Sequence, residues 1–250
     1  MTQQESIDQL RLDYNRLLQR LQSNQRRFDL LARSAFRLQE DERRRLAREL
    51  HDGLGQNLTA LQHLLGLLLE GLAEADQPSR QLAERALKVC RGTLEDTREM
   101  SRLLRPQILD DLGLSAALQS LCRSIRENAG LKVELCIDDE PELDSEQQTV
   151  VFRIAQESLT NVVRHARAQR VELRLRERAR WLTLSIEDDG IGLEQAEGQA
   201  PASGHGSGLR GMRERLRLFG GELKLQPGAQ GGLRVLALLP LDAQPTTPAE

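Results

Sequence analysis

The first part of the chain repeats apolar residues with the period of an α-helix. From Ile7 onward these residues form two rows at a spacing of seven, and Asn24 interrupts the second row. The rows are Ile7, Tyr14, Leu21, Phe28 and Ala35, and then Leu10, Leu17, Leu31 and Leu38. Such a heptad pattern is typical of a coiled coil, in which an asparagine in the seam favours one register. A single amphipathic helix packed on its own domain is the alternative.

The apolar row then shifts by four residues just before His51 and continues to Leu72. A four-residue insertion in a heptad pattern relaxes the supercoil locally. After a break at Pro78, a second helical pattern runs to about Leu104 and ends before Pro106, because proline cannot continue the hydrogen-bond ladder. The pattern predicts two antiparallel helices, which make a four-helix bundle in a dimer.

Beyond Pro106 the pattern changes to mixed helix and strand. Helices are predicted at about 114–129, at 145–167 and from the glycine-rich stretch to Phe219, and strands at 131–137, 171–175, 182–186, 222–226 and 232–240. The short polar connection between the second and third strands predicts a hairpin. We therefore expect an α+β two-layer sandwich after the all-α region, and a disordered tail from Asp242.

Composition narrows the class of protein. The 250 residues include 35 basic and 38 acidic side chains, so nothing indicates a strongly charged face for nucleic acid or anionic lipid. Aromatic residues make up only 2%, which also argues against base stacking. The three cysteines are odd in number and lack CxxC spacing, which favours neither a disulfide framework nor a zinc site and fits a reducing cytoplasm.

The sequence gives no membrane signal. The N-terminus lacks a basic region followed by an apolar stretch, and the most apolar segment, at 64–73, is too short to span a bilayer. We expect a cytoplasmic chain without a membrane span.

The first candidate chemistry lies in ERRRLARELHDGLGQ at 42–56, where Asp52 directly follows His51. A neutral imidazole is a competent nucleophile near pH 7, and an adjacent carboxylate can accept its second proton and orient the ring. We interpret His51 as a nucleophile and Asp52 as its base. A solvated His–Asp pair on an exposed helix is the alternative when these two residues are taken alone.

The whole run resembles the phosphoacceptor motif of the nitrate-sensor-like subfamily of sensor histidine kinases, the HisKA_3 type. The resemblance implies that Gln56 assists hydrolysis of a partner's phosphate by placing a water. The segment LLRPQILDDLGLSAAL at 103–118 also matches the link between the dimerisation and catalytic domains of that subfamily. His63 and His205 lack such a context, and we interpret both as structural.

A second candidate is QESLTNVVRHARA at 156–168. Glu157 and Asn161 are four residues apart, so they share one face of a helix, with His165 one turn further. Such a face can present oxygen ligands to Mg²⁺, which takes its other ligands from water and phosphate. The alternative is the polar surface of an amphipathic helix.

Glycines mark the third candidate, in which DDGIGL at 188–193 follows a strand and GHGSGLRGM at 204–212 opens a helix. Glycines let backbone amides approach a phosphate, and a helix N-terminus adds partial positive charge. Because a single G-x-G also occurs in ordinary turns, the order of the segments matters. In this order, the three segments resemble the N, G1 and G2 boxes of the GHKL ATPases, the family of histidine kinases, gyrase and Hsp90, over about residues 145–240.

This resemblance implies ATP and Mg²⁺ as cofactors. Asn161 would coordinate the metal, Glu157 would support that site, and Arg164 could pair with phosphate. Asp188 would accept a hydrogen bond from the adenine amino group. The residues that would make room for the nucleotide or close over its phosphates are Gly190, Gly192, Gly206, Gly208 and Leu209. The small residues of the lid at 194–207 predict a segment that moves without nucleotide.

Taken together, the patterns and resemblances predict four segments: a coiled-coil signalling helix at 1–41, a dimerisation and histidine phosphotransfer hairpin at 42–106, a GHKL ATP-binding domain at 107–241 and a tail at 242–250. The resemblance implies a homodimer that phosphorylates its own His51 from ATP, passes the phosphate to an aspartate of a response regulator and also dephosphorylates that regulator. A separate sensory partner is a further expectation.

Two rival functions stay open. A GHKL ATPase could use Glu157 to activate water, and a dimeric scaffold could bind nucleotide without turnover.

Overall fold

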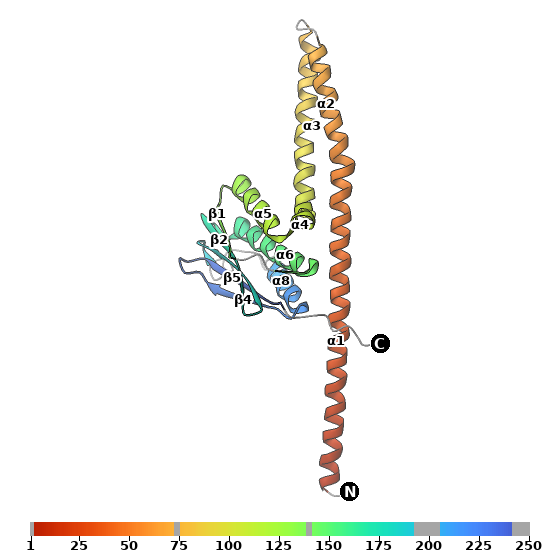
Figure 1. Ribbon diagram of the computed structural model, residues 1–250, viewed down its shortest axis with the longest axis vertical. Helices are drawn as coiled ribbons and strands as arrows, with labels where there is room; N and C mark the ends of the chain where they lie inside the picture. Colours follow the sequence, from red (N-terminus) through yellow and green to blue (C-terminus); the bar gives the residue numbers. More distant parts are fainter. Residues whose placement is uncertain (1–2, 73–75, 139–141, 193–205, 242–250) are drawn as a thin grey trace. The chain divides into compact units, whose positions relative to one another are not determined.

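The structure is a computed structural model that describes residues 3–72, 76–138, 142–192 and 206–241 (Figure 1). Two compact units make up the chain, Met1–Gln39 and Glu40–Glu250. The first unit is the N-terminal part of helix α1 (Gln3–Glu49). The predicted tail and nearly all of the predicted lid lie outside the described residues.

Large apolar side chains of the heptad rows are exposed on this part of α1. Phe28 is 67% exposed, and Leu31 and Leu38 are each 71% exposed. The predicted helix is confirmed. A single helix cannot bury an apolar seam by itself, so the coiled coil stays a prediction about a second copy.

The second unit begins with the end of α1 and a helical hairpin. The π-helical segment η1 (Leu50–Gly55) leads into α2 (Gln56–Gly71), and α3 (Gln77–Leu104) returns alongside it (Figure 1). Helix α3 starts where predicted, because Pro78 occupies its first turn and the Asp76 carboxylate accepts a hydrogen bond from the Ser79 amide at 3.3 Å. The Cys90 thiol on α3 donates to the Leu58 carbonyl of α2 at 3.3 Å.

Two predicted α-helices are interrupted by π-helical turns. The segment η1 contains His51, and a second segment, η2 (Val162–Ala166), follows α6 (Ser145–Asn161). The helix predicted over 145–167 is confirmed as far as Ala166, but its last turn, from Val162, is π-helical. A π-helical turn contains about one more residue than an α-helical turn, so it shifts the residues that follow relative to the faces of a regular α-helix. The register shift predicted just before His51 coincides with η1.

A five-stranded sheet forms one layer of the C-terminal part, in the order β1-β2-β3-β5-β4. Its strands are β1 (Lys132–Ile137), β2 (Arg170–Arg178), β3 (Trp181–Asp188), β4 (Glu222–Pro227) and β5 (Leu233–Pro240). Strand β1 pairs with β2 in parallel, and the other pairs are antiparallel, including the predicted β2–β3 hairpin. The register places Leu173 opposite Ile186 and Ile186 opposite Val235, so apolar side chains form one continuous face.

Helices cover that apolar face and form the second layer (Figure 1). They are α5 (Gly113–Ala129), α6 and α8 (Gly206–Leu218), and the short α4 (Gln107–Asp111), which the sequence pattern did not predict, precedes them. Helix α5 ends at Gly130, which has a φ of +64° that suits glycine. The buried core includes Phe152, Ile154, Leu184 and Leu216. A helical region followed by an α+β two-layer sandwich is therefore confirmed.

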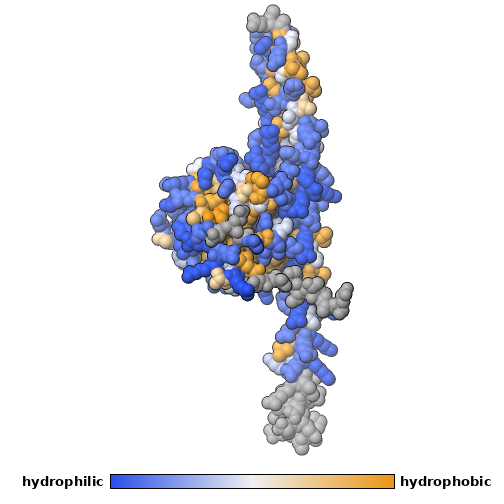
Figure 2. All heavy atoms as spheres, viewed as in Figure 1, coloured by the Kyte–Doolittle hydropathy of each residue, from blue (hydrophilic) through white to orange (hydrophobic). Residues whose placement is uncertain are grey.

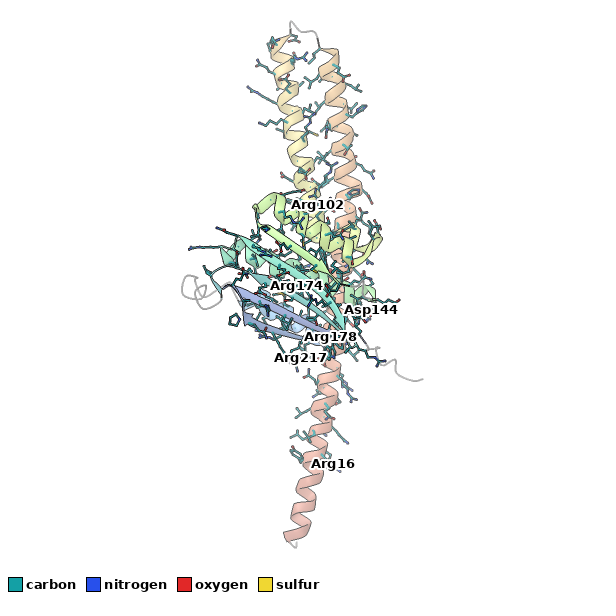
Figure 3. All side chains as sticks on the ribbon, turned by 60° about the vertical axis from the view of Figure 1, so that its left-hand side comes forward. Arg16, Arg102, Asp144, Arg174, Arg178 and Arg217 are labelled. Atoms are coloured by element: carbon teal, nitrogen blue, oxygen red, sulfur yellow. The ribbon has the colours of Figure 1, made fainter. Side chains whose placement is uncertain are left out.

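The opposite face of the sheet is polar. Arg174 and Arg178 lie on β2 (Figure 3), and Arg174 pairs with Glu172 on the same strand. Among the described helices, none combines the length and the apolar run needed to cross a bilayer.

Candidate active site

His51 lies in the π-helical segment η1 with its side chain exposed, and Asp52 next to it is also exposed. A hollow of about 490 Å³ adjoins His51, lined by Leu50, His51, Gly55, Gln56, Thr59, Ala60, His63, Leu94, Thr97, Arg98 and Ser101. The structure thus brings His51 and Gln56 to one hollow, whereas Asp52 lies outside its lining. The side chain of His63 is exposed and lines the same hollow. An exposed imidazole beside an open hollow can be reached by a reacting phosphate.

Helix α6 carries the second group of candidates. Glu157 and Asn161 are partly buried near its C-terminal end. A Cβ added at Gly208, in the first turn of α8, would lie 2.2 Å from Oε1 of Glu157 and 3.7 Å from Nδ2 of Asn161. A side chain at residue 208 would displace the Glu157 carboxylate, so the N-box and G2-box candidates lie together in one site. The first backbone amides of a helix have no partner within the helix, so the N-terminus of α8 is a suitable environment for phosphate.

This site offers one carboxylate and one amide oxygen as possible metal ligands. Among the described residues, no group of three or more His, Cys, Asp or Glu side chains could hold a metal ion by itself. That sparse donor set fits Mg²⁺, which usually keeps several waters and binds one or two protein oxygens together with substrate phosphates. Glu157 and Asn161 are the residues that would hold it.

Asp188 ends β3 and is buried, with 6% of its surface exposed. Burial raises the pKa of this carboxyl, and hydrogen bonds from the backbone amides of Gly190 and Leu233 partly oppose that shift. The Gly190 amide donates to Oδ1 at 2.9 Å. An ionised carboxylate has about four acceptor sites, so Asp188 can accept a further hydrogen bond from a ligand's amino group besides those from two backbone amides.

The loop after Asp188 is fixed against the end of η2. A Cβ on Gly190 would lie 2.1 Å from the Ala166 carbonyl oxygen, and the Ile191 amide donates to that oxygen at 2.9 Å. Gly192 has a φ of +73°. The G1-box glycines are therefore required by close backbone packing, which joins this loop to the element that follows Asn161.

The remaining predicted residues are less closely connected. Leu209 is partly buried on α8, and Gly206 is the first residue of that helix. Arg164 and His165 lie in η2 with exposed side chains. His165 lies about one helical turn after Asn161, within the π-helical segment.

Sequence reasoning missed residues that complete both halves of the site. A Cβ on Gly232 would lie 2.5 Å from Oδ1 of Asp188, so the β4–β5 hairpin packs directly on the adenine candidate. Oδ1 of Asp189 accepts from the amides of Gln169 and Arg170 at 2.8 and 2.9 Å. Arg215 on α8 is partly buried, and burial lowers the pKa of its guanidinium while the charge of Glu157 opposes the shift. The run GAQGG at 228–232 was the one available signal, because adjacent glycines indicate a close backbone approach.

Two protein families match the two regions that hold these candidates. The family described as "Histidine kinase" matches residues 42–109, which contain His51 and Gln56. The family described as "Histidine kinase-, DNA gyrase B-, and HSP90-like ATPase" matches residues 146–243, which contain the second site. The chain belongs to the histidine kinases, of the nitrate-sensor-like type. The match over residues 146–243 implies that this region binds ATP.

Individual histidine kinases align with most of the chain. Sensor histidine kinase MctS of Rhizobium johnstonii is 33% identical over 219 residues, which are 87% of this chain and 47% of that protein. The histidine-protein kinase/phosphatase UhpB of Salmonella typhimurium is 37% identical over 90% of this chain and 44% of its own length. Oxygen sensor histidine kinase NreB of Staphylococcus carnosus is 32% identical over 81% of this chain and 57% of its own length. The chain thus spans about half the length of these relatives.

One solved structure covers a similar range. The histidine kinase domain of the Erythrobacter litoralis EL346 blue-light activated kinase aligns with 76% of this chain at 20% identity and a TM-score of 0.47.

Replacing Asp188 with Asn should weaken ATP binding without weakening the fold. The loss of a hydrogen bond to a charged group predicts roughly a 10- to 100-fold lower affinity. The raised pKa means that the folded chain binds this proton more tightly than the unfolded chain, so ionised Asp188 costs stability, and that cost grows as pH rises through the window above the ordinary pKa. Asp188→Asn should remove this cost at neutral pH.

Titration calorimetry and thermal unfolding of the same samples test this expectation. Asp138→Asn, a change at an exposed aspartate after β1, is the matched control and should leave both quantities unchanged. Unchanged ATP affinity in Asp188→Asn would contradict the assignment of the adenine contact.

Proposed function

We propose that this histidine kinase chain transfers the γ-phosphoryl group of ATP to His51 and then to an aspartate of a response regulator. The observation that carries the proposal is the seating of Gly208 against Glu157 and Asn161 in a chain that also exposes His51 beside an open hollow. The first arrangement suits a phosphate donor and the second a phosphate acceptor.

In the proposed reaction, a ring nitrogen of His51 attacks the γ-phosphorus while the bond from that phosphorus to the β–γ bridging oxygen breaks. ADP is the leaving group, and Asp52 accepts the proton of the other ring nitrogen. Catalysis of this kind depends on positioning and charge stabilisation, because the transferred phosphoryl group needs little covalent help. The backbone amides at the start of α8 would bind the nucleotide's phosphates, and Asp188 would orient its adenine.

Mg²⁺ belongs to the proposal as a resident cofactor. It would neutralise charge on the phosphates, and Asn161 with Glu157 would hold it. Arg164, exposed in η2, would be a further partner for phosphate.

A homodimer is the proposed assembly. The hairpin exposes many large apolar side chains, including Leu61 at 46%, Leu64 at 62%, Leu82 at 70% and Val89 at 69%. Figure 2 shows apolar residues among the polar ones along this hairpin. Packing of a second hairpin would bury them in a four-helix bundle, and the exposed heptad of α1 would pair as a coiled coil.

The proposed division follows from these roles: a signalling helix at 1–41, a dimerisation and phosphotransfer hairpin at 42–106 and an ATP-binding domain at 107–241. The family matches at 42–109 and 146–243 support it. We further propose a cytoplasmic location and a sensory partner that acts through α1.

Radiolabelled ATP tests the transfer itself. Label at the γ position should become covalently attached to the chain and then pass to a purified receiver domain, and label at the α position should be removed when the chain is denatured. Covalent attachment of α-label, or failure of γ-label to attach covalently, would contradict the proposal.

Gln56 separates the two directions of phosphate flow. Attack by His51 needs the imidazole, a base and ATP, whereas removal of phosphate from a regulator needs an oriented water, which a neutral amide can hold. Gln56→Ala should therefore keep most autophosphorylation and slow dephosphorylation of the regulator by a factor on the order of 10² to 10⁴. The name of UhpB, a kinase/phosphatase, supports the presence of both activities.

The lifetime of purified phospho-regulator, mixed with ADP and either wild-type or variant chain, measures this effect. Gln62→Ala, on the same helix but outside the lining of the hollow, is the matched control and should give the wild-type lifetime. Equal lifetimes for wild type and Gln56→Ala, both shorter than that of the regulator alone, would return Gln56 to a solvated helix residue.

A further inference from the structure

A buried carboxylate lies on the helix that precedes His51. Glu40 of α1 is 6% exposed, and it accepts hydrogen bonds from the guanidinium of Arg153 at 2.7 and 3.0 Å. Arg105 and Arg43 each approach the same carboxylate at 3.4 Å. Arg153 is 2% exposed and Arg105 4% exposed, so these charges are removed from water together.

The partners come from three separate parts of the second unit. Glu40 belongs to α1, Arg105 caps the C-terminus of α3, and Arg153 belongs to α6. Arg105 also pairs with Asp110 of α4 at 2.7 Å, and Arg44 of α1 pairs with the same aspartate at 2.6 Å. We call this set the Glu40 cluster: Glu40, Arg44, Arg105, Asp110 and Arg153.

Helix α6 also holds the end of α3. A guanidinium nitrogen of Arg153 donates to the Leu104 carbonyl at 2.6 Å, and the Gln156 amide donates to the Leu103 carbonyl at 3.1 Å. Both carbonyls lie in the last turn of α3, where no intrahelical donor is available. Arg153 therefore binds α1 through Glu40 and also binds the C-terminal end of α3, the second helix of the hairpin.

The main effect of such a cluster is to favour one arrangement of the helices, and its contribution to the stability of the fold is smaller. A buried ion pair is often no more stabilising than apolar residues of the same size, but removing one partner leaves an uncompensated buried charge. Burial lowers the pKa of Arg153, and the hydrogen bonds that Arg153 donates to the Glu40 carboxylate oppose that shift. The stability of the charged Arg153 side chain in this buried position thus depends on Glu40.

This arrangement does not bring the reacting groups together. Among the described residues, those that line the hollow beside His51 all lie within 50–63 and 94–101, and none of them comes from α6, β3 or α8. Transfer requires the imidazole nitrogen about 3–3.5 Å from the phosphorus. Because Glu157 lies one turn after Arg153 on α6, bonds that fix Arg153 also fix the ATP-binding helix in this position.

We propose that the Glu40 cluster is an autoinhibitory latch, which holds the ATP-binding domain on α1 and must open before phosphate reaches His51. The latch rests on the proposed histidine kinase function. Helix α1 is continuous from Gln3 to Glu49, so a rotation or shift of its N-terminal part displaces the Glu40 carboxylate from Arg153 and Arg105. Input to α1 thereby changes the population of the released state.

Glu40→Gln tests the latch because it removes the charge and keeps the size of the side chain. In the full 250-residue chain, we expect the initial rate of autophosphorylation to rise by about 5- to 150-fold, the range typical of coupling between sites. ATP affinity should stay within about twofold of wild type, because the hydrogen bonds of Glu40 go to arginines and not to Glu157, Asn161 or Asp188. Asp41→Asn is the matched control, because Asp41 is the next residue on α1, its side chain is exposed and it precedes the phosphoacceptor motif.

Hydrogen exchange provides a second readout that does not depend on phosphorylation. Amides at 103–112 should lose protection in Glu40→Gln, and those of β2 and β3 should keep it. Loss of protection throughout the sheet would mean that the variant has unfolded. Glu40→Asp, which keeps the charge but has a shorter side chain, then replaces it. We expect this variant to show a smaller rise in the autophosphorylation rate and a smaller loss of protection at 103–112.

An unchanged or lower phosphorylation rate in a folded variant with wild-type ATP affinity would overturn the latch. Unchanged protection at 103–112 would also overturn the latch, whether or not the chain becomes phosphorylated. Absence of phosphorylation in both the wild-type and the variant chains would be a separate result, which counts against the proposed kinase function.

Discussion

His51→Gln should abolish autophosphorylation, with a loss of at least about 10³-fold, because the variant has no nucleophilic nitrogen at the acceptor position. ATP affinity should stay within about twofold of wild type, since the residues that would bind the nucleotide lie on α6, β3 and α8 and not beside His51. Incorporation of γ-label into the chain and calorimetric ATP binding measure the two quantities.

His63→Gln is the matched control for this result. His63 is exposed and lines the same hollow as His51, so it is the nearest competitor for the role of acceptor. It should keep the wild-type rate of labelling. Labelled His51→Gln together with unlabelled His63→Gln would show that the wrong histidine was assigned.

Asn161→Ala should remove Mg²⁺-dependent ATP binding and all phosphoryl transfer. Loss of a metal-site residue typically costs 10- to 100-fold in metal affinity, and phosphoryl transfer depends further on correct placement of the phosphates. We expect ATP affinity in Mg²⁺ to fall by at least about tenfold and the labelling rate by at least about 100-fold. The sheet core and the helical hairpin lie elsewhere, so the proposed dimer should persist in sedimentation experiments.

Asn128→Ala, a change at an exposed asparagine on α5, is the control for side-chain truncation. It should bind ATP and become labelled like the wild type. A folded Asn161→Ala chain with wild-type ATP affinity but a dissociated dimer would make Asn161 a packing residue, which contradicts its role at the metal.

Much of the fold could be predicted because periodicity reports it directly. The alternation through Leu173 and Leu175, and again through Leu184 and Ile186, matches strands with one buried face. Pro106 marked the end of α3. The π turns could not be predicted, because an extra residue in a helical turn leaves the local composition unchanged.

The short helix α4 was missed for a different reason. Only Leu109 of its five residues is buried, so it has too few turns to show a period. Its place in the fold depends on Asp110, whose carboxylate bonds Arg105 and Arg44. Contacts between residues 66 positions apart, such as Arg44 and Asp110, leave no trace in local sequence.

The candidate site was also predicted only in part from the sequence. The motifs selected Glu157, Asn161 and Asp188, and the structure joins the first two through Gly208. The close packing of Gly232 on Asp188 was missed, because the sequence there reads as an ordinary turn between two strands. The Glu40 cluster was missed because a glutamate among many charged residues of α1 has no sequence feature that indicates burial.

The chemistry of the phosphorylated chain tests the central claim most directly. The chain is incubated with Mg²⁺ and γ-labelled ATP, and the protein-bound label is then exposed to acid and to alkali. A phosphorus–nitrogen bond at His51 predicts label that is lost in acid and kept in alkali, and its absence from His51→Gln locates it. Free phosphate without protein-bound label would indicate an ATPase, bound nucleotide without either product would indicate a scaffold, and each result would contradict histidine phosphorylation.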